Sequence, residues 1–381
     1  MKKIYVKGTA VCAALTLILT AALYTTGRRT QPMEVKRDPA SMHLRASHLT
    51  DKKTKTLAVI GAVGDILLHD VVYEDACRQN RCQFDQMFSG VKSYMQNPDL
   101  LIANQESMIG GKELGLSSYP SFNSPYEIAD TLKRMGVDLV TISNNHSMDH
   151  GEKALQRAIA HYEDINMPYT GAYKDKKDSE KLRINTKKGI SFGFLSYTYG
   201  LNGNPLPPGK PYMVNLFSID QVLTDIRKAR TKVDAVVVST HWGSEYERLP
   251  TDDQKKWAKM MAEAGADIII GHHPHVLQPI EWIEHGDRRS LVVYSLGNFL
   301  SGQMRDFKDI GGVLAVTVGK ETTAEGARVS IDSYQFTPTF TMSSNRKGFR
   351  IIPLMEAGEM GLLRKKESYT ETMAHMSRWV K

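Results

Sequence analysis

Residues 57–70 read LAVIGAVGDILLHD, in which the apolar run Leu57–Val63 leads through Gly64 directly into Asp65 and then His69. A run of this length and composition that ends at a glycine is typical of a buried β-strand. In open α/β sheets, ligand-binding side chains gather just beyond the carboxyl ends of the strands. The stretch therefore predicts an α/β sheet with its chemistry at one end.

The same alternation of short apolar runs and amphipathic stretches continues along the chain, which is the pattern of a layered α/β domain. Further strands are predicted over Leu100–Ala103, Val137–Ser143, Ile190–Tyr197, Ala235–Thr240, Ile268–Ile270 and Leu291–Ser295. Helices are predicted over Phe84–Met95, Ser124–Met135, Glu152–Ile165 and Asp252–Ala264. After Gly312 the pattern indicates strands alone, over Val313–Val318, Val329–Ile331 and Tyr334–Thr341, and then a polar helical tail from Glu356.

The composition bounds the class of protein. The chain has 381 residues, of which 41% are apolar and 24% charged, with 29 glycines and 3 cysteines. This is enough for one large domain with appendages, and it excludes a disordered chain. Collagen-like and disulfide-scaffold classes are excluded too, and a single long apolar run excludes a multi-span membrane protein.

The formal net charge of +7 lies at the N-terminal end of the chain. Residues 1–55 hold 11 of the 49 lysines and arginines but only 3 of the 42 aspartates and glutamates, so the remainder is close to neutral. A near-neutral body argues against a broad nucleic-acid-binding face, and no nucleic-acid partner is expected. The basic end is expected to lie against anionic lipid headgroups or a polyanionic polymer.

This basic end has the layout of a membrane anchor or a signal peptide. Lysines precede the apolar run Val11–Tyr24, and Arg28 and Arg29 follow it. With its flanks the run reaches the roughly 20 residues that a bilayer span needs. No small-x-small cleavage site stands out, so an uncleaved anchor over residues 1–27 is favoured and a cleaved signal peptide is the alternative. We expect a single-pass protein of the cell membrane with an extracytoplasmic body.

Beyond the anchor we expect a basic polar linker over residues 28–56, one folded domain over 57–345 and a C-terminal tail over 346–381. Cys77 and Cys82 lie near the start of that domain and would face an oxidising compartment. A redox motif would need closer cysteines, and a zinc knuckle would need more of them. Two possibilities stay open for these cysteines: a local disulfide that closes one loop, or an unbridged pair.

Side chains able to bind a metal follow five of the predicted strands. They are, in chain order, Asp65 and His69; Asn104 and Glu106; Asn145, His146 and Asp149; His241 and Glu245; and His272, His273 and His275. Taken singly, each group has an ordinary explanation as a helix cap, an Asn-rich turn or a packing histidine. Their recurrence at strand ends is hard to explain by packing. Such a mixture suits a borderline divalent cation such as Mn, Zn or Fe, and the lack of a usable cysteine cluster argues against a structural zinc site.

Three other residues have two interpretations each. Trp242 and Tyr246 either line a substrate groove or belong to the core or rim. Asn298, in SLGNF, ends another strand and either reaches the site or forms a turn.

Together these motifs resemble a known family. GDILLHD, ANQES, SNNHSMDHG, HWGSEYER, GHHPHVLQPIE and SLGNF occur in the order and spacing of the CapA/PgsA-type capsule and poly-γ-glutamate synthesis proteins, which are related to the calcineurin-like metallophosphoesterases. The resemblance covers Leu57–Leu314 and the membrane-anchored layout. It implies a layered α/β-β sandwich of the calcineurin-like metallophosphoesterase type, preceded by one N-terminal transmembrane helix.

The resemblance also implies a site for two divalent ions. Asp65 and His275 would serve one ion. The ligands of the other would be Asn145, His241 and His273. Glu106 would bridge the two ions. His146 matches the position that acts as the acid toward a leaving oxygen, and Asp149 would hold it.

The sequence departs from the phosphoesterase pattern at two places. Leu67 stands where those enzymes have the histidine of Asp-x-His, and Glu106 stands where they usually have aspartate. His69 could fill the first place, and His272 is the alternative to His273 as a ligand. Glu245 and Asn298 are the remaining candidates for the site.

The function implied is that of a membrane-anchored, extracytoplasmic protein for synthesis, export or attachment of an anionic capsule polymer, with poly-γ-glutamate as the expected polymer. The expected partners are membrane-embedded polymer synthase subunits and the polymer itself. Two alternatives stay open: a metal-dependent phosphoesterase acting on a cell-envelope phosphate ester, and a metal-free scaffold of a synthase complex. Whether the protein is an enzyme is left open as well.

Overall fold

The structure, a computed structural model, describes residues 53–79, 81–359 and 365–380. The anchor or signal peptide predicted at residues 1–27 lies outside the described residues, as does most of the linker predicted at 28–56. No helix among the residues described is both long and apolar enough to cross a membrane.

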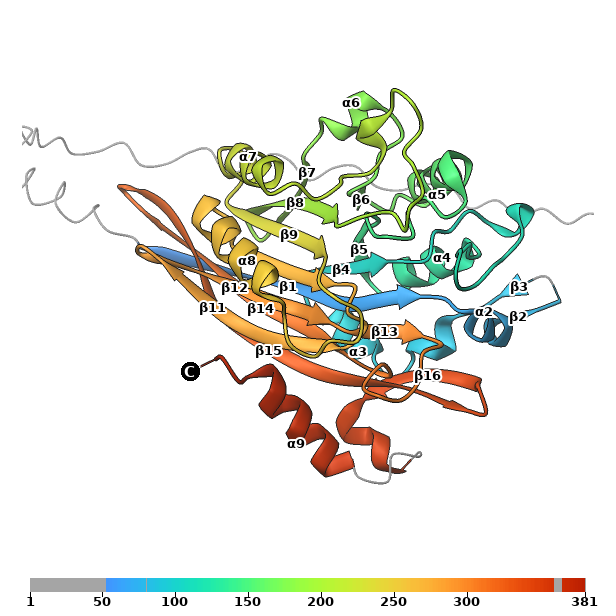
Figure 1. Ribbon diagram of the computed structural model, residues 1–381. Coiled ribbons are helices and arrows are strands. Elements are labelled where there is room, and N and C mark those ends of the chain that lie inside the picture. Colours follow the sequence, from blue (N-terminus) through green and yellow to red (C-terminus); the bar gives the residue numbers. More distant parts are fainter. Residues whose placement is uncertain (1–52, 80, 360–364, 381) are drawn as a thin grey trace, which may run out of the picture. The chain divides into compact units, whose positions relative to one another are not determined.

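Two β-sheets form the centre of the described body (Figure 1). The first is 8-stranded, in the order β16-β15-β14-β1-β4-β5-β6 with β13 beside β1. Its strands are β1 (Thr54–Leu67), β4 (Leu100–Gln105), β5 (Val137–Thr141), β6 (Tyr169–Thr170), β13 (Asn298–Ser301), β14 (Ile310–Thr323), β15 (Gly326–Ser344) and β16 (Lys347–Pro353). The second is 6-stranded, in the order β11-β12-β10-β9-β8-β7. Its strands are β7 (Arg183–Lys187), β8 (Ile190–Thr198), β9 (Ala235–His241), β10 (Ile268–His272), β11 (Leu277–His285) and β12 (Arg288–Leu296).

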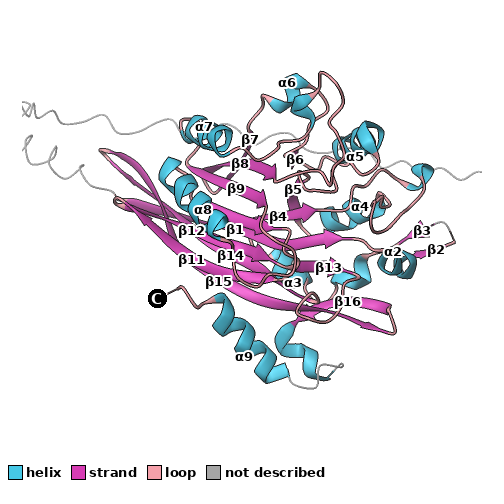
Figure 2. Ribbon diagram, in the orientation of Figure 1, coloured by secondary structure: helices cyan, strands magenta, loops and turns pink. Residues whose placement is uncertain are grey.

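The two sheets pack face to face, and helices cover their outer faces (Figure 2). Because side chains alternate along a strand, Ile60 of β1 points into the core between the sheets, with Val237 of β9, whereas Val63 points to the opposite face. The helices over that opposite face are α3 (Lys92–Gln96), α4 (Glu127–Arg134) and α5 (Gly151–Asp164). On the second sheet, α7 (Ile219–Arg230) and α8 (Asp252–Ala264) cover residues such as Val238. The layered α/β prediction is confirmed, with a further helix layer outside the second sheet.

A local break in β1 fixes the position of Asp65. The pairing of β1 with β4 shifts between Val63 and Asp65, and its pairing with β13 shifts directly after Asp65. Gly64 lies in this break, where an added Cβ would come within 2.1 Å of the Gly297 carbonyl oxygen. That oxygen accepts a hydrogen bond from the Asp65 backbone N–H at 2.8 Å. The close approach requires glycine at position 64.

Two predicted helices differ in the structure. The segment Phe84–Met95 forms a short 3₁₀ helix, Asp85–Phe88, and then α3, because the chain at Gly90 packs against β16. A Cβ at Gly90 would come within 2.7 Å of the Ile351 carbonyl oxygen. The helix predicted from Ser124 begins at Glu127 instead, since the Ser124 hydroxyl donates to Ser107 Oγ and caps no helix. Tertiary contacts override local helix signals in both places.

The folded body continues past residue 345, where the sequence suggested a tail. The segments Val329–Ile331 and Tyr334–Thr341, predicted as two strands, form one long strand, β15, with a register shift near Asp332. Strand β16 then pairs antiparallel with β15. The polar segment forms helix α9 (Lys365–Met376), as expected, and it packs on β11: His375 Nε2 lies 3.0 Å from the Leu277 carbonyl oxygen (Figure 1).

A disulfide joins Cys77 to Cys82, so of the two alternatives the structure has the bridged one. The cysteines lie opposite each other in a hairpin of β2 (Cys77–Arg78) and β3 (Arg81–Cys82). The hairpin follows α2 (Asp70–Ala76) and projects from the end of the body to which the arrow of β1 points (Figure 1).

Candidate metal centre

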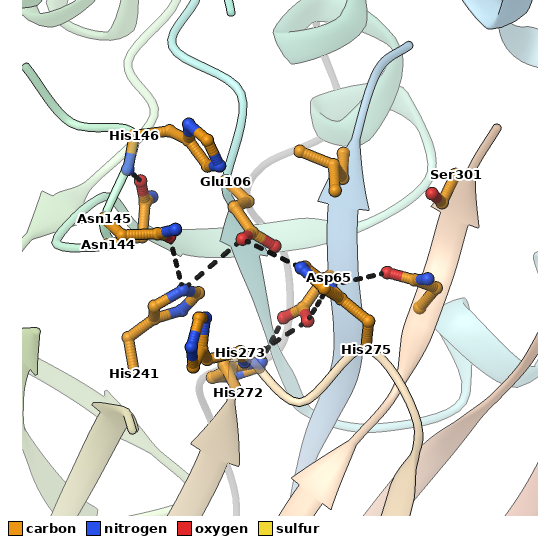
Figure 3. A network of polar contacts seen from close by, with 12 residues as sticks. Asp65, Glu106, Asn144, Asn145, His146, His241, His272, His273, His275 and Ser301 are labelled. Carbon is orange, nitrogen blue, oxygen red and sulfur yellow. Dashed lines mark hydrogen bonds and ion pairs between the residues drawn. The ribbon is translucent and has the colours of Figure 1, made fainter. Parts of the chain in front are cut away.

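The polar ends of both sheets meet in one buried cluster (Figure 3). The first sheet contributes Asp65 in β1, Glu106 after β4 and Asn145 after β5. The second sheet contributes His241 at the end of β9, His272 at the end of β10, and the following His273 and His275. All seven side chains are buried. Residues separated by more than 200 positions in sequence therefore lie together, as the strand-end pattern predicted.

Asp65 is hydrogen-bonded through both carboxylate oxygens. Oδ1 accepts from Asn104 Nδ2 at 2.9 Å and lies 2.8 Å from His272 Nδ1. Oδ2 accepts from the His273 backbone N–H at 3.4 Å and lies 3.5 Å from His275 Nδ1. Burial alone would raise the pKa of Asp65, but the hydrogen bonds from His272 and His275 outweigh it and hold that pKa well below its usual range. Asp65 is therefore a fixed negative charge.

Glu106 has the opposite environment. Neither of its carboxylate oxygens has a hydrogen-bond partner among the described residues. Oε1 lies 3.3 Å from His241 Nε2 and 3.8 Å from His275 Nε2. Burial raises the pKa of Glu106 to about 8, although the charge of His275 acts against the rise. Burying a carboxyl group without hydrogen bonds costs free energy, and a bound cation would offset that cost. Glu106 is therefore placed as a metal ligand would be.

The turn after β10 holds its two histidines in unusual backbone conformations. His273 has φ 95° and His275 has φ 58°, a region of the backbone map that residues other than glycine occupy infrequently. Burial lowers the pKa of His273 to about 2, so its imidazole is neutral. Burial acts the same way on His275, but Glu106 and Asp65 outweigh it and raise the pKa of His275 to about 9.

These residues fit a divalent metal ion. One ligand atom from each of Glu106, His273 and His275 can be chosen so that all three lie within 4.8 Å of one another. His273 Nδ1, His241 Nδ1 and both Glu106 oxygens are buried without a hydrogen-bond partner among the described residues. Neutral imidazoles and carboxylates are the donors that Zn, Mn and Fe take in proteins; His273 is already neutral, and an ion would have to displace a proton from His275.

Asn145 and His241 form the side of the cluster nearest β5. Asn145 Oδ1 lies 2.8 Å from His241 Nε2, and Asn145 Nδ2 donates to Asn202 Oδ1 at 3.2 Å. Burial holds the pKa of His241 well below its usual range, although Asp65 acts in the opposite direction. His241 is therefore a neutral imidazole in contact with Glu106 and Asn145.

His146 and Asp149 form a separate pair at the edge of the cluster. His146 Nδ1 lies 2.7 Å from Asp149 Oδ2, and both side chains are buried. Asp149 Oδ2 also accepts from the Phe122 backbone N–H at 2.7 Å, and the Phe122 ring packs edge-on against the imidazole. Because an ionised carboxylate only accepts hydrogen bonds, Nδ1 carries the proton and Nε2 is the other proton-exchanging atom.

The remaining candidates lie around the cluster. His69 is turned away from it: its Nδ1 accepts from the Gly302 backbone N–H at 3.2 Å, and its ring packs against Phe122. His272 bonds Asp65, whereas His273 belongs to the potential ligand group. Asn298 reaches the cluster, with Oδ1 3.1 Å from His275 Nδ1. Glu245 is exposed in the loop after β9.

The aromatic candidates divide between core and rim. Trp242 is fully buried, and its Nε1 donates to the Tyr294 carbonyl oxygen at 3.0 Å, so it is a core residue and lines no groove. Tyr246 is half exposed, and its ring lies 6.1 Å from that of His275.

The sequence did not single out several residues that complete the site. Tyr199 places its ring 4.5 Å from that of His273 and is half exposed. Asn202 bonds Asn145, and Asn204 Nδ2 donates to Asp149 Oδ1 at 3.4 Å. These residues come from the segment YGLNGN after β8, whose only sequence signal is that of a turn.

Several known proteins are similar to this chain. A family model described as "Bacterial capsule synthesis protein PGA_cap" matches residues 59–303. The capsule biosynthesis protein CapA of Bacillus anthracis is 32% identical over 259 residues, which is 63% of this chain and 59% of the relative, so less than two thirds of that relative is matched. The PGA biosynthesis protein CapA of Bacillus subtilis (strain 168) is 30% identical over 305 residues, 76% of this chain and 75% of the relative.

Among solved structures, the calcineurin-like phosphoesterase YfkN from Bacillus subtilis is 15% identical with a TM-score of 0.44, and the match covers 84% of this chain and 99% of that one.

Proposed function

The chain belongs to the family of bacterial capsule synthesis proteins PGA_cap, and we propose from that membership that it serves in the synthesis, export or attachment of an anionic capsule polymer, with poly-γ-glutamate as the polymer. The observation that carries the proposal is the extent of the family match. It covers residues 59–303, and every residue of the buried cluster lies within that range. The relatives from two Bacillus species, named for capsule and PGA biosynthesis, point the same way.

The proposal includes a two-metal site. Asp65 and His275 would hold one ion, Asn145, His241 and His273 the other, and Glu106 would lie between them. The buried atoms without hydrogen-bond partners belong to Glu106, His241 and His273, and they support the second ion of this assignment. A bound pair of Mn, Zn or Fe ions would lower the pKa of a water molecule and stabilise charge on a substrate oxygen.

The protein's own side chains would do the remaining work. Asp65, held by His272 and Asn104, keeps a negative charge in place. Asp149 would hold the Nδ1 proton of His146 and fix the ring; when Nε2 is protonated as well, the imidazolium would give that second proton to a departing oxygen. Tyr199 and Tyr246, half exposed beside the histidines, form the wall that a substrate would contact.

We place the body outside the cytoplasm, anchored through residues 1–27, beside membrane-embedded synthase subunits. The basic-flanked apolar run supports the anchor, and the Cys77–Cys82 disulfide supports an oxidising compartment. Protease added to intact cells should digest the body and leave cytoplasmic proteins whole. Digestion only after lysis would refute the placement.

The metal and the capsule role can be tested together. The full-length protein, purified in detergent, should contain a divalent metal by elemental analysis, and Asp65→Asn should lose it. A strain carrying Asp65→Asn on the chromosome should make little capsule polymer by immunoblot while keeping normal amounts of the protein. Normal capsule in that strain would show that the site is dispensable, and metal-free protein that still supports capsule would favour a scaffold.

A second candidate is a metal-dependent phosphoesterase that acts on a cell-envelope phosphate ester. The His146–Asp149 pair at 2.7 Å favours it, because a positioned histidine serves ester cleavage directly. Purified protein should then hydrolyse nitrophenyl phosphate mono- or diesters, and His146→Ala should abolish the reaction. Metal-loaded protein without any such hydrolysis favours the capsule role over this candidate.

A further inference from the structure

A cavity lies just past the end of strand β13, the strand that starts at the metal centre. Strand β13 leads from Asn298, the partner of His275, to Gly302, about 13 Å further on at the usual rise of a strand. Gly302 donates its backbone N–H to His69 and lines a cavity of about 730 Å³. The far wall of this cavity is formed by the turn between β15 and β16, at Asn345 and Arg346.

A second cavity, of about 360 Å³, continues from that turn. It shares Asn345 and Arg346 with the first, and its other walls include Lys347 and Arg78 of the disulfide-closed hairpin. Both hairpins project from the end of the body to which β1 and β13 point (Figure 1). The two cavities together, called here the arginine trough, lie between the end of β13 and the disulfide hairpin.

Three arginines of the arginine trough have no carboxylate partner among the described residues. Arg305, Arg346 and Arg78 are exposed, and none of their guanidinium groups has an ion pair or a hydrogen bond to a carboxylate among the described residues. By contrast, Arg134 pairs with Asp85 and Arg230 with Asp267. Unpaired guanidinium groups gathered in one concave surface indicate a binding site for anions.

None of the carboxylates in the lining of the arginine trough forms an ion pair with these guanidinium groups among the described residues. Asp309 Oδ2 accepts the backbone N–H of Arg305 at 3.0 Å, and burial raises the pKa of Asp309. Asp75 Oδ2 accepts the backbone N–H of Phe349 at 2.9 Å. Glu74 is the exposed carboxylate of the lining. Counting Lys347, the lining holds four cations against these three carboxylates, which gives it a formal charge of +1.

We propose that the arginine trough holds an anionic polymer with repeated carboxylates while one of its links or ends lies at the metal centre. This rests on the proposed function, whose site it extends. Guanidinium groups bind carboxylates through two parallel hydrogen bonds, and spaced cations along an open channel suit a chain with many charges. The disulfide would keep the hairpin of Arg78 in position at the far end.

The test compares two charge-matched double variants of the full-length protein in detergent. R305Q/R346Q removes two cations of the arginine trough. R227Q/R378Q removes two exposed, unpaired arginines of the described body elsewhere, on α7 and after α9. Binding of fluorescein-labelled poly-γ-glutamate is measured by anisotropy at two salt concentrations. We expect the first variant to bind about tenfold more weakly with a smaller salt dependence, and the second to bind within about twofold of the parent.

Equal affinities in all three proteins, or equal losses in both variants, would overturn the proposal. It is also overturned if R305Q/R346Q weakens binding of polyphosphate or of phosphatidylglycerol vesicles but not of poly-γ-glutamate. A gene deletion that leaves capsule intact, together with the expected binding results, would refute the proposed function and leave the arginine trough as a polymer-binding surface. Loss of capsule on deletion with unchanged binding refutes only the arginine trough.

Discussion

At the scale of the residue, the two acidic side chains of the metal centre are held in opposite states. Asp65 accepts hydrogen bonds on both oxygens, and its pKa is lowered in spite of burial, whereas Glu106 accepts none and burial raises its pKa. The protein's own donors thus stabilise the charge of Asp65, whereas the charge of Glu106 would be stabilised only by a bound cation. The difference follows from which neighbours donate to each carboxyl group.

Asp65→Asn and Asp149→Asn make the same chemical change at two positions and should have different effects. Asp65→Asn removes the fixed negative charge from the cluster, so bound metal should fall below detection by elemental analysis. Asp149→Asn should keep the metal, because Asp149 contacts His146 and no potential ligand, but should reduce capsule polymer or ester hydrolysis about 100-fold. Metal loss in both variants would show that Asp149 supports the whole cluster.

Sequence reasoning reached most of the residues in the cluster because each follows a recognisable apolar strand. Of the adjacent His272 and His273 it favoured His273 as the ligand, with His272 as the alternative. In the structure His272 contacts Asp65, and His273 belongs to the potential ligand group with Glu106. Tyr199 and Asn202 were missed because their loop carries only turn signals, and its approach to the cluster is a tertiary feature.

At the scale of the element, local signals set boundaries only where tertiary contacts agree with them. Helix α8 begins and ends as predicted, because Thr251 and Gln254 form a capping box and Gly265 ends it with φ 116°. The helix predicted over 84–95 is broken where the chain packs on β16. Helix α7 and strand β11 were not predicted, although the apolar residues of α7 recur at the spacing of an amphipathic helix and were a usable signal.

The break in β1 gives an element-scale prediction. Gly64→Ala should lower the free energy of unfolding by about 3 kcal/mol or more, because a Cβ would come within 2.1 Å of a backbone oxygen that cannot move alone. Gly200→Ala is the control, since a Cβ there would meet nothing within 4 Å, and it should be near neutral. Denaturant unfolding measures both, and equal effects would mean that β1 adapts to the added methyl group.

The disulfide hairpin gives a second prediction at this scale. Replacing both cysteines, Cys77→Ser with Cys82→Ser, should cost about 2 kcal/mol of unfolding free energy, since the bridge closes a short loop with a sequence separation of 5. Reductant should destabilise the parent by the same amount and leave the double variant unchanged in thermal unfolding. A reductant effect on the double variant would contradict this account.

At the scale of the whole molecule, the fold depends on how two sheets meet, which the sequence does not specify. Strands such as β9 and β10 are apolar on both faces, so their pattern does not show which face meets the other sheet. Away from the buried cluster, Lys320 of β14 makes one of the polar links between the sheets: it donates to Asp234, which precedes β9 and also accepts from Ser191.

That link predicts a pH-dependent stability. Burial alone would raise the pKa of Asp234, but the hydrogen bonds from Lys320 and Ser191 hold it below its usual value. A lowered pKa in the folded state means that the stabilisation is complete above the unfolded pKa of about 3.9 and is lost as the pH falls through the folded value. Asp234→Asn should therefore cost about 1 kcal/mol at pH 7 and progressively less below pH 4.

Asp287→Asn is the matched control for Asp234→Asn, because the Asp287 side chain is 79% exposed in its pair with Arg328. Urea unfolding between pH 3 and pH 8 would give both profiles. A cost for Asp234→Asn that stays constant down to pH 3 would show that the charge of Asp234 is not what links the sheets.

The metal centre takes Asp65 and Glu106 from one sheet and His241, His273 and His275 from the other. An ion bound by residues of both sheets would cross-link them, since the sheets could not separate until its coordination bonds broke. Its main effect would then be on the rate of unfolding, because contacts made late in folding slow escape from the native state more than they speed its formation. Loading the protein with metal should lengthen its lifetime in protease by more than the shift in its melting temperature implies, and chelation should return that lifetime to the metal-free value.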